Sequence, residues 1–189
     1  DITLMRALPN MTVIVPADAA ETKAAVKWAA SYKGPVYIRM GRAKCDDIIP
    51  EDKPFVPGKS TTLKEGSDVT FIACGIMTAK ALKAAESLEK QGISARVINM
   101  SSIKPIDEEA IVKAAEETGA IITAEEHTVK GGLGGAVAEV LALKKPCLMD
   151  MVGTEDTFGQ SGKADELLEV YGLTAEHLIS SALHLISRK

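Results

Sequence analysis

The chain has 189 residues, of which 46% are hydrophobic and only 4% aromatic, and it carries a net charge of -4. This length suits one domain, or one domain and a fragment of another. An acidic chain without windows of lysine and arginine around stacking aromatics is not expected to bind nucleic acid. No apolar stretch reaches the roughly 18 residues that span a membrane, and the first residues do not form a signal peptide, so no membrane association is expected.

Three cysteines, Cys45, Cys74 and Cys147, are far apart in the sequence and form no C-x-x-C pair. Their odd number and spacing predict a reducing, cytoplasmic setting, with Cys74 and Cys147 as small core residues. The chain begins at Asp1 rather than at a methionine, inside what reads as the last turns of a helix. We therefore expect a truncated or proteolysed product.

The first forty residues alternate between helical and extended patterns. Residues 1–7 have helical spacing, and 11–15 and 36–38 read as strands. Between these strands, Asp18 and Glu21 have the spacing of a capping box, in which the Asp18 carboxylate accepts from free amides of a first helical turn. This region is therefore predicted to be α/β.

Two arginines, Arg39 and Arg42, flank Gly41 at the carboxyl end of the second predicted strand. In open α/β sheets ligands bind beyond this end of the strands, and a guanidinium offers a planar fork to a phosphate or a carboxylate. The alternative for each arginine is a surface salt bridge.

Periodicity is lost between Cys45 and Ser67, where prolines, charges and glycines are frequent. A connection of this length favours a linker between two domains, although Ser60 to Leu63 could add a short edge strand.

Beyond this connection, strands and helices alternate along the chain. Such alternation predicts parallel strands with helices on both faces of the sheet. The expected strands are 69–73, 95–100, 120–124 and 147–152, and the expected helices are 78–91, 107–118 (capped by Asp107), 137–143, 164–170 and 174–186.

A glycine-rich turn joins the third of these strands to a helix of small residues. Glycines at this place can leave backbone amides free to bind a phosphate. The dinucleotide fingerprint is imperfect because Val137 stands where it needs Gly or Ala, although Asp150 does end the next apolar run. Tight packing of the helix on the sheet is the main expectation, with a bound phosphate as the alternative. The glycines are Gly131, Gly132, Gly134 and Gly135.

Other side chains have weaker patterns. Glu125, Glu126 and His127 could form an acid–base cluster after the strand, although a histidine in a polar loop is more often a bystander. His177 and His184 share a helix face and have no partners at metal-ligand spacing, so they are interpreted as surface residues.

The longer runs that carry a family resemblance are LMRALPNMTVIVPADAAETKAAV, GPVYIRMGR, VTFIACGIMTAKALKAAESLEKQGISARVINMSSIKPID, TAEEHTVKGGLGGAVAEVL, DTFGQSG and LLEVYGLTAEHL. Together they resemble the C-terminal portion of transketolase, above all the separately encoded C-terminal subunit of split transketolases. The resemblance covers essentially the whole chain. Two sister families, 1-deoxyxylulose-5-phosphate synthase and the beta subunits of 2-oxo acid dehydrogenases, share the architecture and are alternatives, as is a nonenzymatic assembly or nucleotide-binding module.

The resemblance implies an α/β fold with a three-layer α/β/α C-terminal domain. Its mostly parallel five-stranded sheet would have one antiparallel edge strand. Residues 1–43 would form the C-terminal end of the pyrimidine-binding domain for thiamine diphosphate, 44–66 a linker, and 67–189 the transketolase C-terminal domain.

The implied activity is the transfer of a two-carbon ketol unit between sugar phosphates in the pentose phosphate pathway, with thiamine diphosphate and Mg²⁺ in the complete enzyme. Arg42 matches the family arginine that binds the substrate phosphate, whereas Arg39 matches an arginine of the synthase family. No catalytic, cofactor-binding or metal-binding residue is assigned within this chain. We therefore expect it to be inactive alone, to need a cofactor-binding N-terminal subunit or domain, and to make homodimer contacts.

Overall fold

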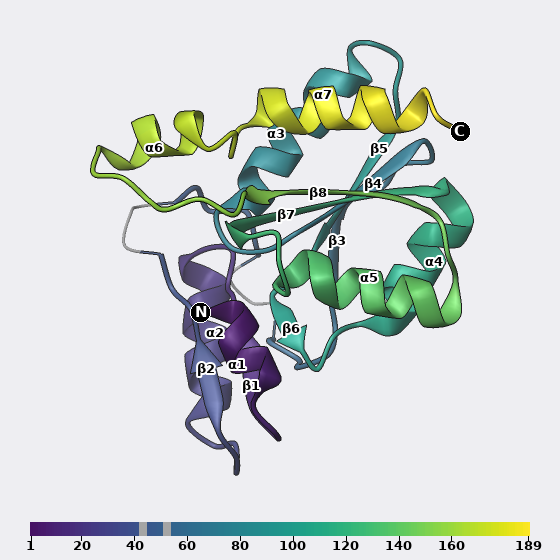
Figure 1. Cartoon of the computed structure of the whole chain (residues 1–189). Helices are drawn as coiled ribbons and strands as arrows, with labels where there is room; N and C mark the ends of the chain where they lie inside the picture. Colours follow the sequence, from purple (N-terminus) through teal and green to yellow (C-terminus); the bar gives the residue numbers. More distant parts are fainter. Residues whose placement is uncertain (42–44, 51–53) are drawn as a thin grey trace.

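The computed structural model describes residues 1–41, 45–50 and 54–189 (Figure 1). A small N-terminal region lies against one end of a larger region that is built on a five-stranded sheet. The helices are α1 (Ile2–Ala7), α2 (Ala19–Ala29), α3 (Met77–Glu89), α4 (Glu108–Thr118), α5 (Leu133–Lys144), α6 (Ala164–Val170) and α7 (Ala175–Ile186), and the strands are β1 (Thr12–Ile14), β2 (Val36–Ile38), β3 (Thr61–Lys64), β4 (Val69–Ala73), β5 (Ala95–Asn99), β6 (Ser102–Lys104), β7 (Ala120–Thr128) and β8 (Leu148–Thr154).

The larger sheet has the strand order β3-β5-β4-β7-β8, in which β4, β5, β7 and β8 are parallel and β3 pairs antiparallel with β5. Helices α3 and α7 cover one face, and α4 and α5 cover the other (Figure 1). The predicted three-layer α/β/α architecture, with a mostly parallel five-stranded sheet after the end of another α/β unit, is confirmed.

Strand β4 shows why this region folds as it does, because all five of its residues are buried. Successive side chains of a strand point to opposite faces. Accordingly, Phe71 packs in the core on the α3 and α7 side, whereas Ile72 packs in the core on the α4 and α5 side. A continuous apolar run is therefore what this central parallel strand requires.

The N-terminal region forms a second sheet of order β2-β1-β6, with β1 parallel to β2 and antiparallel to β6. Strand β6 comes from the larger region and was not predicted, because three residues carry too little periodicity. The two regions also share a core, in which Ile2 and Val13 pack with Ile72 and Met100. The N-terminal sheet is thus completed by the chain that follows it.

Two predicted boundaries near the glycine-rich turn are wrong. Strand β7 continues to Thr128 instead of ending at residue 124, and α5 begins at Leu133 instead of 137. Glu125, Glu126 and His127 therefore lie within the strand rather than after it. The possible edge strand is confirmed as β3, within the stretch expected to be a linker.

The three cysteines are free thiols at different depths in the fold. Cys45, Cys74 and Cys147 are free, and burial raises the pKa of the Cys74 thiol well above its usual value. Cys147 is half-buried and packs at the edge of the core. Across the described ranges, every helix is too short or too polar to cross a lipid bilayer.

Candidate functional site

The carboxyl ends of β4 and β7 lie beside two connected clefts. From β4 the chain winds first to β5 on one side and later to β7 on the other, and ligands of open α/β sheets bind at such a switch point. Each cleft has a volume of about 620 Å³. The lining residues that they share are Arg39, Gly41, Cys45, Ile76 and Glu126.

The first cleft, here the α2 cleft, extends over the N-terminus of α2 and is also lined by Pro16, Ala17, Asp18, Ala19, Thr22 and Lys23. The second, here the α6 cleft, extends between α3 and α6 and is also lined by Ala79, Lys80, Lys83, Thr154, Gln160, Leu168 and Tyr171. The site therefore takes its walls from both regions of the chain.

Asp18 fixes one wall of the α2 cleft. As predicted, it caps α2, and Asp18 Oδ1 accepts from the Glu21 amide at 2.8 Å. Its other oxygen, Oδ2, accepts from the amides of Ile48 and Ile49 at 2.8 and 2.6 Å. This buried carboxylate thus links the N-terminus of α2 to residues 48–49, which directly follow the cleft-lining residue Asp47.

Glu21 does not close the capping box that its spacing predicted. Its Oε2 accepts from the Ala17 amide at 2.7 Å, one residue before the cap. Its Oε1 accepts from Asn99 Nδ2 at 2.9 Å and from Ser101 Oγ at 2.7 Å, both in the larger region. Sequence reasoning missed this link because a glutamate in a first helical turn gives no sign that it will be buried.

Arg39 lies at the end of β2 and crosses to β7. Its Nη2 donates to the Glu126 carbonyl at 2.9 Å, and Nη1 lies 3.2 Å from Glu126 Oε2. Its Nε lies 3.1 Å from Asp1 Oδ2. The guanidinium is therefore held between two carboxylates, which is the salt-bridge alternative for this residue.

A bulge in β7 directs the acidic pair. Ala124 pairs with Val152 and Thr128 with Thr154, so three residues of β7 lie opposite a single residue of β8. That residue is Gly153, where an added Cβ would come within 2.6 Å of the His127 carbonyl oxygen. Bulges re-aim side chains next to functional sites, and this one sends neighbouring side chains in different directions.

Glu125 points into the molecule, where its carboxylate accepts from the amides of Leu133 at 2.7 Å and Gly134 at 2.8 Å. An added Cβ on Gly132 would lie 2.0 Å from Glu125 Oε2, and one on Gly134 would lie 2.8 Å from Met151 Sδ. Burial raises the pKa of Glu125, although the hydrogen bonds from the two amides oppose this. The glycine-rich turn therefore serves close packing, and a carboxylate of the chain itself occupies the amides that a phosphate would need.

Glu125, Glu126 and His127 do not form the acid–base cluster that their sequence suggested. Glu126 pairs with Arg39, and the nearest Glu125 carboxylate oxygen is 3.6 Å from His127 Nδ1. That nitrogen donates to the Thr128 carbonyl oxygen at 2.9 Å, and burial lowers the pKa of His127. Each group already has a structural partner.

The remaining candidates lie in different places. Asp150 accepts from Ser181 of α7, so it supports a helix rather than a ribose. His177 and His184 are exposed on α7, as predicted. Arg42 lies outside the described residues, and its proposed role stays a prediction.

The glycine-rich turn does not offer its amides at the start of α5 to the diphosphate of a thiamine cofactor. Glu125 occupies the exposed amides at the start of α5, which are the backbone donors that a glycine-rich turn could offer. Within residues 1–41, 45–50 and 54–189, no group of three or more His, Cys, Asp or Glu side chains could hold a metal ion. No chemical step is therefore assigned to that cofactor on this chain.

Two family descriptions match the sequence: transketolase, C-terminal domain, over residues 58–178, and transketolase, pyrimidine binding domain, over residues 1–46. The chain is 46% identical, over 189 residues, to a 6-deoxy-6-sulfo-D-fructose transketolase subunit of Clostridium sp. strain MSTE9, covering 100% of this chain and 59% of that protein. It is 48% identical, over 183 residues, to a putative transketolase C-terminal section of Methanocaldococcus jannaschii, covering 94% of this chain and 56% of that protein.

A solved structure described as a split gene transketolase, inactive beta4 tetramer, matches with a TM-score of 0.96 and 54% identity, covering 98% of this chain and 61% of that chain. Identity to the sister synthases is lower. It is 38% to the 1-deoxy-D-xylulose-5-phosphate synthase of Heliobacterium modesticaldum, covering 98% of this chain and 29% of the synthase. The chain thus spans less than two thirds of each of these proteins.

Proposed function

The chain belongs to the transketolase family, and from this we propose that it works as the C-terminal part of a transketolase that transfers a two-carbon ketol unit between sugar phosphates. The observation that carries the proposal is the likeness of almost the whole chain to a split-gene transketolase chain. The sister synthase is less well supported because its identity to this chain is lower. A nucleotide-binding module is not favoured, because Glu125 occupies the amides of the glycine-rich turn.

In this proposal the chain is catalytically incomplete. In the complete enzyme, thiamine diphosphate would supply the carbanion chemistry of ketol transfer. A cofactor-binding N-terminal subunit or domain would hold its diphosphate and Mg²⁺, which is supported by the occupied amides of the glycine-rich turn and by the lack of a metal-binding cluster among the described residues. This chain would form part of the wall of the substrate cleft and make homodimer contacts.

We assign Arg42 to the phosphate of the sugar substrate. Its neighbour Gly41 lines both clefts at the switch point of the sheet. Arg39 is a structural support in this proposal, because Asp1 and Glu126 already hold its guanidinium. A second arginine at this strand end would then be the planar fork that pairs with the phosphate.

Kinetics of an Arg42→Ala variant in the complete complex test this assignment. Loss of a charge-assisted pair worth about 1.5–3 kcal/mol should raise the Michaelis constant for phosphorylated sugars roughly 10- to 100-fold. Arg188→Ala, at the exposed C-terminal end, is the matched control and should leave the constant unchanged. Wild-type kinetics in the Arg42 variant would remove Arg42 from the substrate site.

We also propose a cytoplasmic location and a place in the pentose phosphate pathway. Three free cysteines, one of them fully buried, support a reducing compartment. The pathway follows from the reaction class alone, so a substrate screen with the complete complex would test it.

A further inference from the structure

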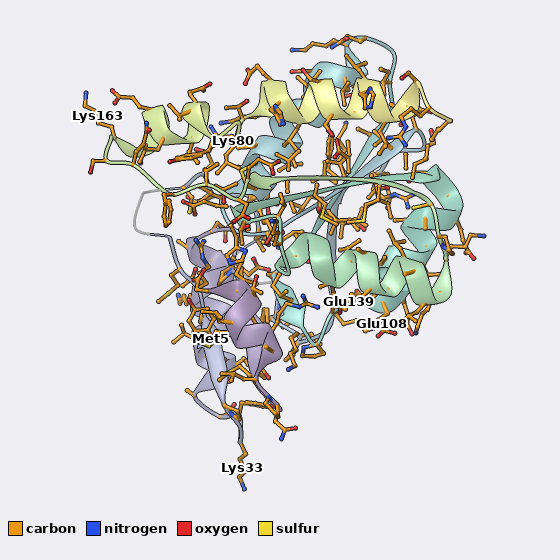
Figure 2. The ribbon with its side chains drawn as sticks, viewed as in Figure 1. Met5, Lys33, Lys80, Glu108, Glu139 and Lys163 are labelled. Carbon is orange, nitrogen blue, oxygen red and sulfur yellow. The ribbon has the colours of Figure 1, made fainter. Side chains whose placement is uncertain are left out.

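The α6 cleft contains a lysine to which the proposed function gives no role. Lys80 belongs to α3, is half-buried and lines the cleft. Figure 2 shows it between α3 and α6. The core-facing residues of α3 include Met77 and Ala81, so Lys80 is on the side of the helix that faces the cleft rather than the sheet.

The other cations of this cleft already have acidic partners. Asp1 and Glu126 hold the Arg39 guanidinium, and Lys83 Nζ lies 3.0 Å from Asp46 Oδ2. In the part of the chain that the structure describes, no carboxylate lies within 4.0 Å of the Lys80 ammonium. Among the described residues that line this cleft, Lys80 is therefore the cation available to an incoming anion.

The surroundings of Lys80 strengthen such a pairing. The same cleft is lined by Ile76, Leu168 and Tyr171, whose apolar surfaces leave less room for water on one side of the cleft. A charge pair next to apolar walls is stronger than the same pair in bulk water. An ammonium is a compact point charge without a fixed fork, so it suits a tetrahedral phosphate that arrives from a range of directions.

The position of the cleft connects Lys80 to the proposed substrate site. The α6 cleft shares Arg39 and Gly41 with the α2 cleft, so the two are continuous beside the strand end that precedes Arg42. We propose that Lys80 binds the anionic end of the sugar substrate and so favours phosphorylated over unphosphorylated sugars, an inference that rests on the proposed function. The C-terminal region would then take part in substrate selection directly.

The test uses the complete complex with two donors, a ketose phosphate and the same ketose without its phosphate. Lys80→Met should lower kcat/KM for the phosphorylated donor about tenfold or more, the effect expected when one charge-assisted contact is lost. Lys80→Met should leave kcat/KM for the unphosphorylated donor unchanged. Lys80→Arg should retain most of the wild-type preference for the phosphorylated donor. The matched control is Lys33→Met, an exposed lysine at the far tip of the N-terminal region (Figure 2).

The outcomes separate this inference from the function on which it rests. An active wild-type complex whose Lys80→Met variant keeps its preference, or loses activity equally on both donors, would overturn the role of Lys80 and leave the ketol transfer intact. An inactive wild-type complex would overturn the proposed function. In that case calorimetric titration of the chain with ribose 5-phosphate decides, because binding that is equal in wild type and Lys80→Met refutes the anion site, and weaker binding to the variant supports it.

Discussion

The two regions of this chain bury their residues in different ways. In the five-stranded region, β4 is buried along its whole length, with a core on each face of the sheet. In the N-terminal region, β2 is only half-buried along its length, and its sheet needs β6 from the other region as a third strand. The five-stranded region has one core made only of its own residues, on the α3 and α7 side. The N-terminal region instead packs into the core that the two regions share.

Polar contacts at the boundary compensate for this difference. Glu21 reaches Asn99 and Ser101 across the boundary, and Arg39 reaches Glu126. Because both clefts lie at this boundary, the same contacts that attach the N-terminal region also fix the walls of the candidate site. Stability and site geometry should therefore respond together when these contacts are removed.

The largest expected effect tests the self-sufficient core. Phe71 is fully buried between the sheet and the helices α3 and α7. Phe71→Ala should lower the free energy of unfolding in urea by about 3–5 kcal/mol, since it removes a large side chain and leaves a cavity. Phe158→Ala is the control, because that ring is fully exposed and its loss should cost less than about 0.5 kcal/mol. Equal effects of the two variants would contradict the description of the core.

A smaller loss is expected at the boundary. Glu21→Ala leaves Asn99, Ser101 and the Ala17 amide without their buried acceptor, at a cost of about 2–3 kcal/mol. Hydrogen exchange should accelerate in β1 before it accelerates in β4. Glu86→Ala, at an exposed position of α3, is the control. It should change neither the free energy of unfolding nor hydrogen exchange in β1 and β4. If hydrogen exchange accelerates equally in β1 and β4, the two regions do not differ in how strongly they depend on the contacts between them.

The third effect concerns α1. Lys104 Nζ donates to the carbonyl oxygens of Arg6 at 2.8 Å and Leu8 at 2.7 Å, which ties the end of α1 to β6. Lys104→Met should cost about 1 kcal/mol in urea unfolding, because two carbonyl groups near the surface lose a partner but regain water. Lys113→Met, on an exposed position of α4, should be neutral. A neutral Lys104 variant would mean that the other contacts of α1, including those of Thr3 and Arg6 with the turn before α5, hold the helix without Lys104.

The smallest expected effect is a change in how the free energy of unfolding depends on pH, and it arises from a residue of the larger region. Burial raises the pKa of Glu125 in the folded chain, so between the ordinary glutamate pKa of about 4.3 and this higher value the folded state binds more protons than the unfolded state. Stability contributed by Glu125 is complete below this window and is lost as the pH rises through it.

Unfolding of wild type and Glu125→Gln from pH 4 to pH 7 measures this slope. The stability of wild type relative to the variant should fall with rising pH, because glutamine does not ionise. Parallel curves would show that the two amides of α5 balance burial at this carboxylate, and a relative stability that rises with pH would show that they outweigh it.

Most of the fold could be predicted because it depends on local patterns. Asp18 and Asp107 cap helices as their positions indicate, and Gly119 has a φ of 63° where α4 ends. Strand β6 could not be predicted, because its three residues become a strand only by pairing with β1, about ninety positions earlier in the chain. The bulge in β7 likewise depends on its register with β8.

The site was less predictable than the fold, for a related reason. The residue types and their strand-end position drew attention to Arg39 and Glu126, and both line the clefts. Their mutual pairing, the inward turn of Glu125 and the reach of Glu21 depend on contacts between residues far apart in sequence. Lys80 gave no sequence signal, because a lysine on a helix is ordinarily a solvated residue.

Reconstitution is the most direct test of the central claim, that this chain is one part of a transketolase. The chain would be mixed with a cofactor-binding N-terminal subunit, thiamine diphosphate and Mg²⁺, and ketol transfer between sugar phosphates would be measured. The account predicts transfer when both chains are present and none with this chain alone. Transfer by this chain alone, or a folded complex of both chains that transfers no ketol unit, would contradict it.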